Sequence, residues 1–281
     1  MRATAYWTIA PGRGELRTEE IETPGPHEVL VRTLASGVSR GTELLVHRHE
    51  VPAAIAPDMR APFQAGDLPG PVKYGYLAVG VVEEGPDELR GRRVFCLHPH
   101  QDRFVVPSAS VVPIPDDVPS FRAVLAGTVE TAVNALWDAA PRIGDRAAVV
   151  GAGMVGLGVA MLLARHPLGR LQVVEADEQR RALVADMGLA AVAPEDAAGH
   201  CDLTFHASAT AAGLGTSLGL LGVEGELIEL SWYGTTEPPA PLGGPFHSRR
   251  LTIRASQVGR IAPARAARRT PSDRLATALE A

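Results

Sequence analysis

Residues 146–164 read RAAVVGAGMVGLGVAMLLA, and this stretch decides the fold of the chain. An apolar run leads into Gly151-x-Gly153-x-x-Gly156, and an apolar segment of helical length follows. Gly151 permits a tight turn, Gly153 lets the backbone approach a diphosphate, and Gly156 lets a helix pack closely against the strand. The N-terminus of that helix favours the charge of the phosphates. We therefore predict a dinucleotide-binding turn with contacts from Gly151, Gly153, Met154, Val155 and Gly156.

The next predicted strand, LQVVEA, ends in Glu175, about twenty residues beyond the turn. An acid at this place accepts hydrogen bonds from two hydroxyls of the adenosine ribose and repels a 2′-phosphate. NAD is therefore favoured over NADP as the cofactor. The alternative is a glycine turn in an ordinary α/β sheet, with Glu175 as a solvated strand end.

The segments on either side of this stretch differ in pattern. Up to about residue 118, short apolar runs cut by Gly and Pro predict antiparallel strands that form a barrel. From about residue 121, strands alternate with helix-length segments, which is typical of a doubly wound parallel sheet. The predicted strands are 146–150, 171–175, 202–205, 226–231 and 251–255, and the predicted helices are 123–139, 154–165 and 178–187. The expected domains are 1–120 and 121–262, followed by an Arg-rich tail, 263–281.

Composition excludes several classes of protein. Hydrophobic residues make up 46% of the chain and charged residues 21%, which is typical of a globular protein. A net charge of -5 provides no attraction to nucleic acid or to an anionic membrane. Cys96 and Cys201 match no metal-ligand spacing, and the N-terminus has no apolar leader. We expect a cytoplasmic protein that acts on a small molecule.

The strings SGVSRGTE, PVKYGY, LHPHQ, ETAVNALWDA, ELSWYG, FHSRRL and SQVG occur along the chain. With them, residues 1 to about 260 resemble the medium-chain dehydrogenase/reductase superfamily, and within it an alcohol-dehydrogenase-like branch that includes bacteriochlorophyllide a dehydrogenase. The resemblance implies an α/β protein, with an N-terminal GroES-like β-barrel domain and a Rossmann doubly wound parallel sheet. In these relatives a C-terminal segment returns to complete the barrel. This chain ends about twenty residues after SQVG, so we expect that segment to be missing.

The zinc-dependent members of the superfamily bind their metal through a Cys, a His in a Gly-His-Glu turn, and a further Cys or Glu. By register, Ser39 and Tyr76 occupy the first two positions here, and the third falls near residues 126–128. Zinc needs clustered imidazole, thiolate or carboxylate ligands. We therefore expect no catalytic zinc and no other metal.

Oxidation of an alcohol without a metal still needs a group that takes the hydroxyl proton. Tyr76 is one candidate, with Lys73 close enough in sequence to lower its pKa, and the alternative for Tyr76 is a packing role. Glu43 is the second candidate, unless it only pairs with Arg40. The histidines of LHPHQ, His98 and His100, are the third, unless they are ordinary loop residues.

The remaining polar positions extend the predicted cofactor site. Ser208 and Ser231 follow strands of the second half, so we expect them at the carboxyl edge of the sheet as carboxamide or ribose contacts. Glu130 and Asn134 lie one helical turn apart and either contact the nicotinamide ribose or bond across the domain interface. The arginines of the tail, Arg260, Arg265, Arg268, Arg269 and Arg274, form either a solvated face or a docking surface for an anionic partner.

Two functions from different classes remain open on the sequence alone. One is an NAD-dependent, zinc-independent oxidoreductase that interconverts a secondary alcohol and a ketone. The other is a nucleotide-binding protein without redox turnover, either a degenerate partner subunit or a non-redox acid/base enzyme. Residues 251–255 are expected to form an edge strand that pairs in a homodimer.

Overall fold

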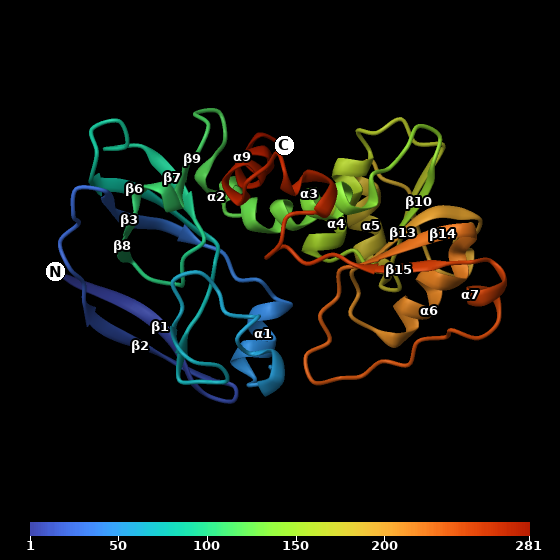
Figure 1. Ribbon diagram of the computed structural model, residues 1–281, viewed down its shortest axis with the longest axis horizontal. Coiled ribbons are helices and arrows are strands. Elements are labelled where there is room, and N and C mark those ends of the chain that lie inside the picture. Colours follow the sequence, from blue (N-terminus) through green and yellow to red (C-terminus); the bar gives the residue numbers. More distant parts are fainter. The chain divides into compact units, whose positions relative to one another are not determined.

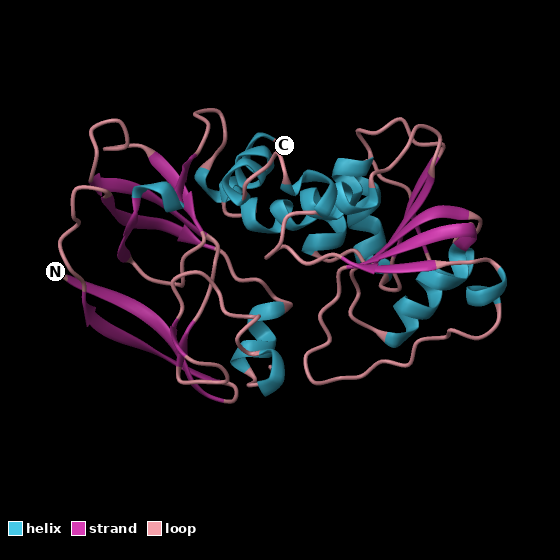
Figure 2. Ribbon diagram, in the orientation of Figure 1, coloured by secondary structure: helices cyan, strands magenta, loops and turns pink.

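The computed structural model describes residues 1–281, which fold into two compact units. Figures 1 and 2 show their strands and helices. The first unit comprises Met1–Gly127 with Leu275–Glu280, and the second comprises Thr128–Arg274 with Ala281. The chain passes between the units inside two helices, α3 (Ala126–Ala139) and α9 (Pro271–Glu280). The division therefore lies a few residues later than the expected boundary at residue 120.

The first unit is built from two antiparallel sheets, with strand orders β2-β1-β5-β4 and β8-β3-β6-β7-β9. Its strands are β1 (Arg2–Ala10), β2 (Arg13–Glu20), β3 (Glu28–Ser36), β4 (Ala65–Gly66), β5 (Val72–Lys73), β6 (Ala78–Glu84), β7 (Arg93–Cys96), β8 (Arg103–Pro107) and β9 (Val111–Pro113). Its helices are α1 (Thr42–His47) and α2 (Ser120–Ala123), with short 3₁₀ turns at Ala53–Ile55 and Ser108–Ser110. The short strands separated by Gly and Pro are those that the sequence predicts.

The second unit is a parallel sheet of six strands in the order β12-β11-β10-β13-β14-β15. The strands are β10 (Arg146–Val150), β11 (Arg170–Val174), β12 (Ala191–Val192), β13 (Cys201–His206), β14 (Leu221–Glu229) and β15 (Thr252–Ala255). The helices are α4 (Met154–Leu163), α5 (Glu178–Asp186), α6 (Ala211–Leu220), α7 (Pro245–Ser248) and α8 (Pro263–Ala266), with a 3₁₀ turn at Pro194–Asp196. This strand order is that of dinucleotide-binding sheets, so the predicted fold class is confirmed.

The apolar strands of this sheet are buried on both faces. Ala147 and Val149 of β10 pack in the cluster that contains α3, α4 and α5, while Ala148 and Val150 pack in the cluster that contains α6. Figure 2 shows helices on both faces of the sheet. Because neither face meets water, residues 147–150 of β10 are all apolar, without polar alternation.

The C-terminal helix α9 belongs partly to the core of the first unit. Leu275 and Leu279 are buried against Leu77, Phe95 and Ile114. The expectation that no C-terminal segment completes the first unit is therefore wrong. The helix places its buried leucines four residues apart on one face, a pattern too short to be recognised among the polar residues of the tail.

Arg274 is 3% exposed, so it is part of neither a solvated face nor a docking surface. Its Nε donates to Glu130 Oε1 at 3.0 Å and its Nη1 donates to Asn134 Oδ1 at 2.7 Å. Burial raises the pKa of Glu130, and the charge of Arg274 opposes that shift. Glu130 and Asn134 thus share one helix face as expected, but they bind Arg274 inside the second unit.

No helix of the protein combines the length and the apolar character needed to cross a membrane.

Candidate functional site

The glycine turn joins β10 to α4 and uses two of its glycines for the fold itself. Gly151 has a φ of +103°, and a Cβ there would lie 2.8 Å from the backbone nitrogen of Ser208. A Cβ on Gly156 would collide with the carbonyl oxygen of Gly151. Both positions therefore exclude a side chain even without a ligand.

Gly153 differs from these two glycines because the fold does not require it. Its φ is -76°, and a Cβ at this position would meet no atom within 4 Å. Gly153 is the N-cap of α4 and no side chain caps the helix there, so first-turn amides such as those of Met154 and Val155 lack helical partners. An open cradle at a helix N-terminus fits the diphosphate of a dinucleotide.

Glu175 lies directly after β11 and is 9% exposed, so the alternative of a solvated strand end is wrong. Its Oε2 accepts from the amide of Ala152 at 2.8 Å, and its Oε1 accepts from the amide of Asp177 at 3.0 Å. Each carboxylate oxygen keeps a second lone pair, which can accept from a ribose hydroxyl. The acid that the sequence predicts for the ribose also holds the glycine turn in place.

Ser208 and Ser231 follow β13 and β14 at the carboxyl edge of the sheet, as expected. The Ser231 hydroxyl accepts from the amide of Ala209 at 3.0 Å, which ties the two loops together. Ser208 lies against Gly151, so its hydroxyl belongs to the surroundings of the glycine turn.

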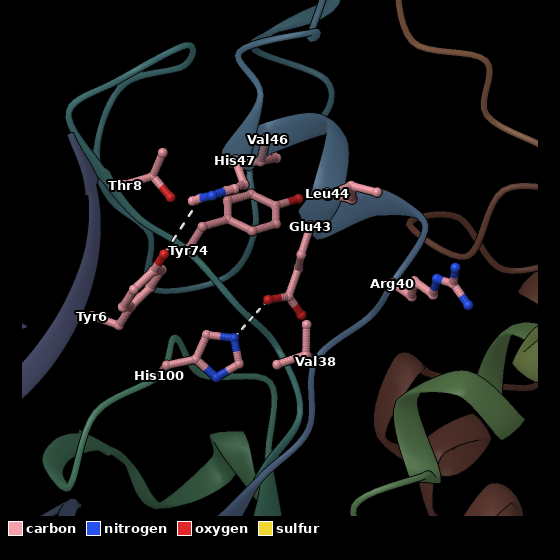
Figure 3. Close-up of a pocket in the computed structure, with 10 residues that line it drawn as sticks. All are labelled: Tyr6, Thr8, Val38, Arg40, Glu43, Leu44, Val46, His47, Tyr74 and His100. Atoms are coloured by element: carbon pink, nitrogen blue, oxygen red, sulfur yellow. Dashed lines mark hydrogen bonds and ion pairs between the residues drawn. The ribbon is translucent and has the colours of Figure 1, made fainter. Parts of the chain in front are cut away.

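The first unit contains a cavity of about 500 Å³ (Figure 3). Most of the surface that lines it is apolar, and the acid Glu43 enters it from α1. The lining residues are Tyr6, Thr8, Val38, Arg40, Glu43, Leu44, Val46, His47, Tyr74 and His100.

Glu43 is part of a hydrogen-bonded chain that leads out of this cavity. Its Oε2 lies 2.6 Å from His100 Nε2 (Figure 3). His100 Nδ1 in turn lies 2.5 Å from Ser36 Oγ. The second oxygen, Oε1, accepts from the amide of Ser39 at 2.8 Å. Both Glu43 and His100 are largely buried, whereas Ser36 is exposed. A carboxylate, an imidazole and a hydroxyl in sequence can carry a proton between the cavity and solvent.

The hydrogen bonds of Glu43 and His100 decide between alternatives that the sequence left open for these two residues. The partner of Glu43 is His100, and Figure 3 shows Arg40 directed away from the pair. His100 is therefore not an ordinary loop residue. Ser36 was not recognised from the sequence, although it is the last residue of β3 and the first of the SGVSRGTE segment that contains Glu43.

The predicted effect of Lys73 on Tyr76 is wrong. The Lys73 ammonium donates to Glu19 at 2.6 Å and to Gln101 at 2.9 Å. Burial raises the pKa of Tyr76, and hydrogen bonds from Ser39 and Thr42 only oppose this shift. Lys73 belongs to β5 and Tyr76 to the segment after it, and side chains of extended backbone alternate in direction, so nearness in sequence did not bring them together.

His98 is a packed imidazole in the structure. Its ring stacks on Phe104 with centroids 3.8 Å apart and on Phe63 at 5.6 Å. Its Nδ1 lies 2.9 Å from the carbonyl oxygen of Pro99. Burial lowers the pKa of His98 to about 4, so it is neutral at pH 7 and a weak base.

The burial of His98 predicts an acid-sensitive fold. Unfolded, the imidazole binds a proton near pH 6.5, whereas folded it does so only near pH 4. Stability from this group is complete above pH 6.5 and falls by about 1.4 kcal/mol per unit as the pH drops towards 4. We expect His98→Phe to lose less stability than wild type between pH 7.5 and 5, measured by urea unfolding. Equal losses in the two proteins would contradict this account.

The residues at the zinc-ligand positions of the relatives do not fit a zinc ion. Ser39 and Tyr76 are bonded to neighbouring groups of the chain, and hydroxyl and phenol oxygens are not the ligands that zinc prefers. No group of three His, Cys, Asp or Glu side chains is arranged to hold a metal ion.

Comparisons with known proteins show the fold. No family model and no curated protein matches the sequence. A thermostable alcohol dehydrogenase from Pyrobaculum aerophilum has a TM-score of 0.77 at 19% identity, covering 100% of this chain and 88% of that one. A short chain alcohol dehydrogenase from Escherichia coli CFT073, complexed with NADH, has a TM-score of 0.76 at 16% identity, covering 99% and 87%.

A third similar structure is CAD from Helicobacter pylori complexed with NADP(H), with a TM-score of 0.77 at 13% identity, covering 100% of this chain and 88% of that one. These likenesses confirm the fold that the sequence resemblance implied, a GroES-like unit followed by a Rossmann unit. Membership of the superfamily, and of its narrower branch, stays a prediction.

Proposed function

We propose that this protein is an NAD(H)-dependent, zinc-independent oxidoreductase that interconverts a secondary alcohol and a ketone on a small to medium organic substrate. The observation that carries the proposal is the open cradle at Gly153 beside the buried carboxylate of Glu175. The fold does not need glycine at 153, so the glycine is explained by a ligand that approaches the backbone. The likeness to dehydrogenases crystallised with NADH and NADP(H) supports the same conclusion.

In the proposed reaction, residues of the second unit bind the nucleotide and residues of the first unit move the proton. When bound, the nicotinamide nucleotide supplies or accepts the hydride. The amides at the start of α4 hold the diphosphate, and Glu175 accepts from the adenosine ribose. Glu43 takes the proton of the alcohol and passes it to His100 Nε2, while the proton on His100 Nδ1 moves to Ser36 and to solvent.

The cavity favours an apolar substrate. Val38, Leu44 and Val46 line it together with two tyrosines, and its volume suits an organic molecule of moderate size. Among its polar side chains, Glu43 bonds to His100, and the Tyr6 hydroxyl lies 3.4 Å from His47 Nδ1, which leaves few of them free to bind the many hydroxyls of a sugar. We therefore expect alcohols with a single hydroxyl beside an apolar group to be better substrates than polyols.

A titration with NADH and NADPH tests the proposal. The purified protein is analysed for metal, nicotinamide fluorescence is followed, and NAD reduction by a panel of secondary alcohols is then measured. Tight NADH binding with turnover and no stoichiometric zinc is the expected result. Binding without turnover would favour a nucleotide-binding protein that has no redox activity, and the absence of binding would remove the oxidoreductase assignment.

Glu175 is expected to set the preference for NAD over NADP. Glu175→Gln keeps an oxygen for the amide of Ala152 but removes the charge that repels a 2′-phosphate. The ratio of the NADPH to the NADH dissociation constant should fall about tenfold, which corresponds to about 1.4 kcal/mol. Fluorescence titration of both nucleotides measures this ratio, and an unchanged ratio would show that Glu175 only holds the turn.

We also propose that the protein is a homodimer. The four residues of β15 are exposed and form one edge of the six-stranded sheet, which leaves backbone groups free to pair with a second copy. Ile253→Lys should weaken such pairing by placing charge in the interface. Light scattering at micromolar concentration should give a dimer for wild type and a monomer for the variant, whereas a monomeric wild type would exclude the dimer.

Both cysteines, Cys96 and Cys201, are buried and free. Burial raises the pKa of each thiol, so both are unreactive. This state supports our proposal that the protein works in the reducing cytoplasm.

A further inference from the structure

His206 and Glu229 form a buried pair at the carboxyl edge of the Rossmann sheet. They are register partners at the ends of the adjacent parallel strands β13 and β14, so their side chains lie side by side. His206 Nδ1 lies 2.8 and 3.0 Å from the two oxygens of Glu229. The other ring nitrogen, Nε2, lies 2.7 Å from Ser208 Oγ. The His206 side chain is 0% exposed and that of Glu229 15% exposed, and the pair thus links a largely buried carboxylate to a half-buried hydroxyl.

The partners of this pair decide where its protons lie. Glu229 also accepts from the Ser231 amide at 2.8 Å and from the Tyr233 hydroxyl at 3.3 Å, so it is fully used as an acceptor. The imidazole proton therefore sits on Nδ1 and points at Glu229, which leaves Nε2 as the acceptor for the Ser208 hydroxyl. Burial and Glu229 raise the pKa of Tyr233, so its phenol stays protonated.

A second hydrogen bond to the Ser208 hydroxyl determines how many further hydrogen bonds its oxygen can accept. Thr210 Oγ1 accepts from the amide of Gly213 and lies 3.0 Å from Ser208 Oγ, so its own hydrogen is free to point at Ser208. One lone pair of Ser208 is then left to face a ligand.

The position of Ser208 connects this network to the glycine turn. A Cβ on Gly151 would meet the backbone of Ser208, and a Cβ on Gly213 would collide with its hydroxyl. Burying a carboxylate is costly even when it is paired and hydrogen-bonded. A pair that ends at a ligand-facing hydroxyl beside the turn is therefore better explained by ligand binding than by stability.

We propose that His206 and Glu229 are positioning residues that orient the Ser208 hydroxyl as an acceptor for an N–H or O–H donor of the bound nicotinamide nucleotide. The inference rests on the proposed function, because it requires that the nucleotide binds at the glycine turn. The donor is a carboxamide N–H or a ribose hydroxyl.

NADH titration of the full chain at pH 8 tests this inference with four variants. Ser208→Ala removes the hydroxyl and leaves the pair intact. His206→Asn keeps a donor for Glu229 but loses the contact with Ser208, whereas His206→Gln reaches Ser208 and loses the contact with Glu229. Thr204→Val is the matched control, since Thr204 lies on the same strand and its hydroxyl is buried without a partner.

We expect Ser208→Ala and His206→Asn to bind NADH about 3- to 10-fold more weakly than wild type at pH 8, as the loss of one hydrogen bond requires. His206→Gln should retain more affinity than His206→Asn, and Thr204→Val should match wild type. Wild-type affinity in both Ser208→Ala and His206→Asn would overturn the inference alone, whereas a wild type that does not bind NADH would overturn the proposed function with it.

Discussion

Gly153→Ala should raise the dissociation constant for NADH about 100-fold, which corresponds to about 2.7 kcal/mol. The added methyl group meets no protein atom within 4 Å, so it fills only the space that the diphosphate needs. The φ of -76° is accessible to alanine. The free energy of unfolding should change by no more than about 1 kcal/mol, the usual effect of alanine at an N-cap. Nicotinamide fluorescence and urea unfolding measure the two quantities.

Gly215→Ala is the matched control for this variant. Gly215 lies inside α6 of the same unit, and a Cβ there also meets nothing within 4 Å. Alanine in a helix interior should stabilise the protein by about 1 kcal/mol and leave NADH affinity unchanged. If Gly153→Ala binds NADH as tightly as Gly215→Ala does, the cradle is not a diphosphate site.

The sequence predicted the Rossmann unit well because its local signals agree with one another. The predicted strand 146–150 has the observed bounds of β10, and α4 begins at the predicted Met154. Apolar strand, glycine turn and apolar helix are all decided by residues within a short window. By contrast β12, two residues long, carried no periodic signal and was missed.

The misjudged positions depend on partners that are distant in sequence. From the sequence, Arg274 was interpreted as part of a basic tail and Lys73 as a neighbour of Tyr76. In the structure, Arg274 pairs with Glu130 and Lys73 pairs with Glu19. Charge at one position does not reveal the burial of that position. Buried pairs of this kind are predictable only when the three-dimensional neighbours are known.

The candidate site shows the same limit. Glu43 and His100 were each recognised as able to move a proton, but their contact joins α1 to a loop that follows β7. His206 and Glu229 each end a strand of the parallel sheet, where ligands bind in such folds. Both residues could therefore have been predicted to lie at the ligand-binding edge of the sheet. The register of the two strands, which the sequence does not reveal, makes them neighbours.

Glu43→Gln should slow the reduction of NAD by the best secondary alcohol of the panel about 10²- to 10⁴-fold, the usual contribution of a positioned base. The amide keeps the shape of the side chain and an oxygen for the Ser39 amide, so α1 should remain intact. Because the glycine turn is not altered, the NADH dissociation constant should stay at the wild-type value. Rates and affinity are measured on the same preparation.

Glu83→Gln is the matched control, since it neutralises another acid of the first unit. Glu83 pairs with Arg32 and Arg103 at the surface, and loss of such pairs costs at most about 1 kcal/mol of stability. Its turnover should equal that of wild type. Glu43→Asp retains the carboxylate one methylene further from His100 and should recover part of the rate. If Glu43→Gln turns over at the wild-type rate, the proton leaves the alcohol by a route that does not include Glu43, and the chain through His100 to Ser36 has no part in the reaction.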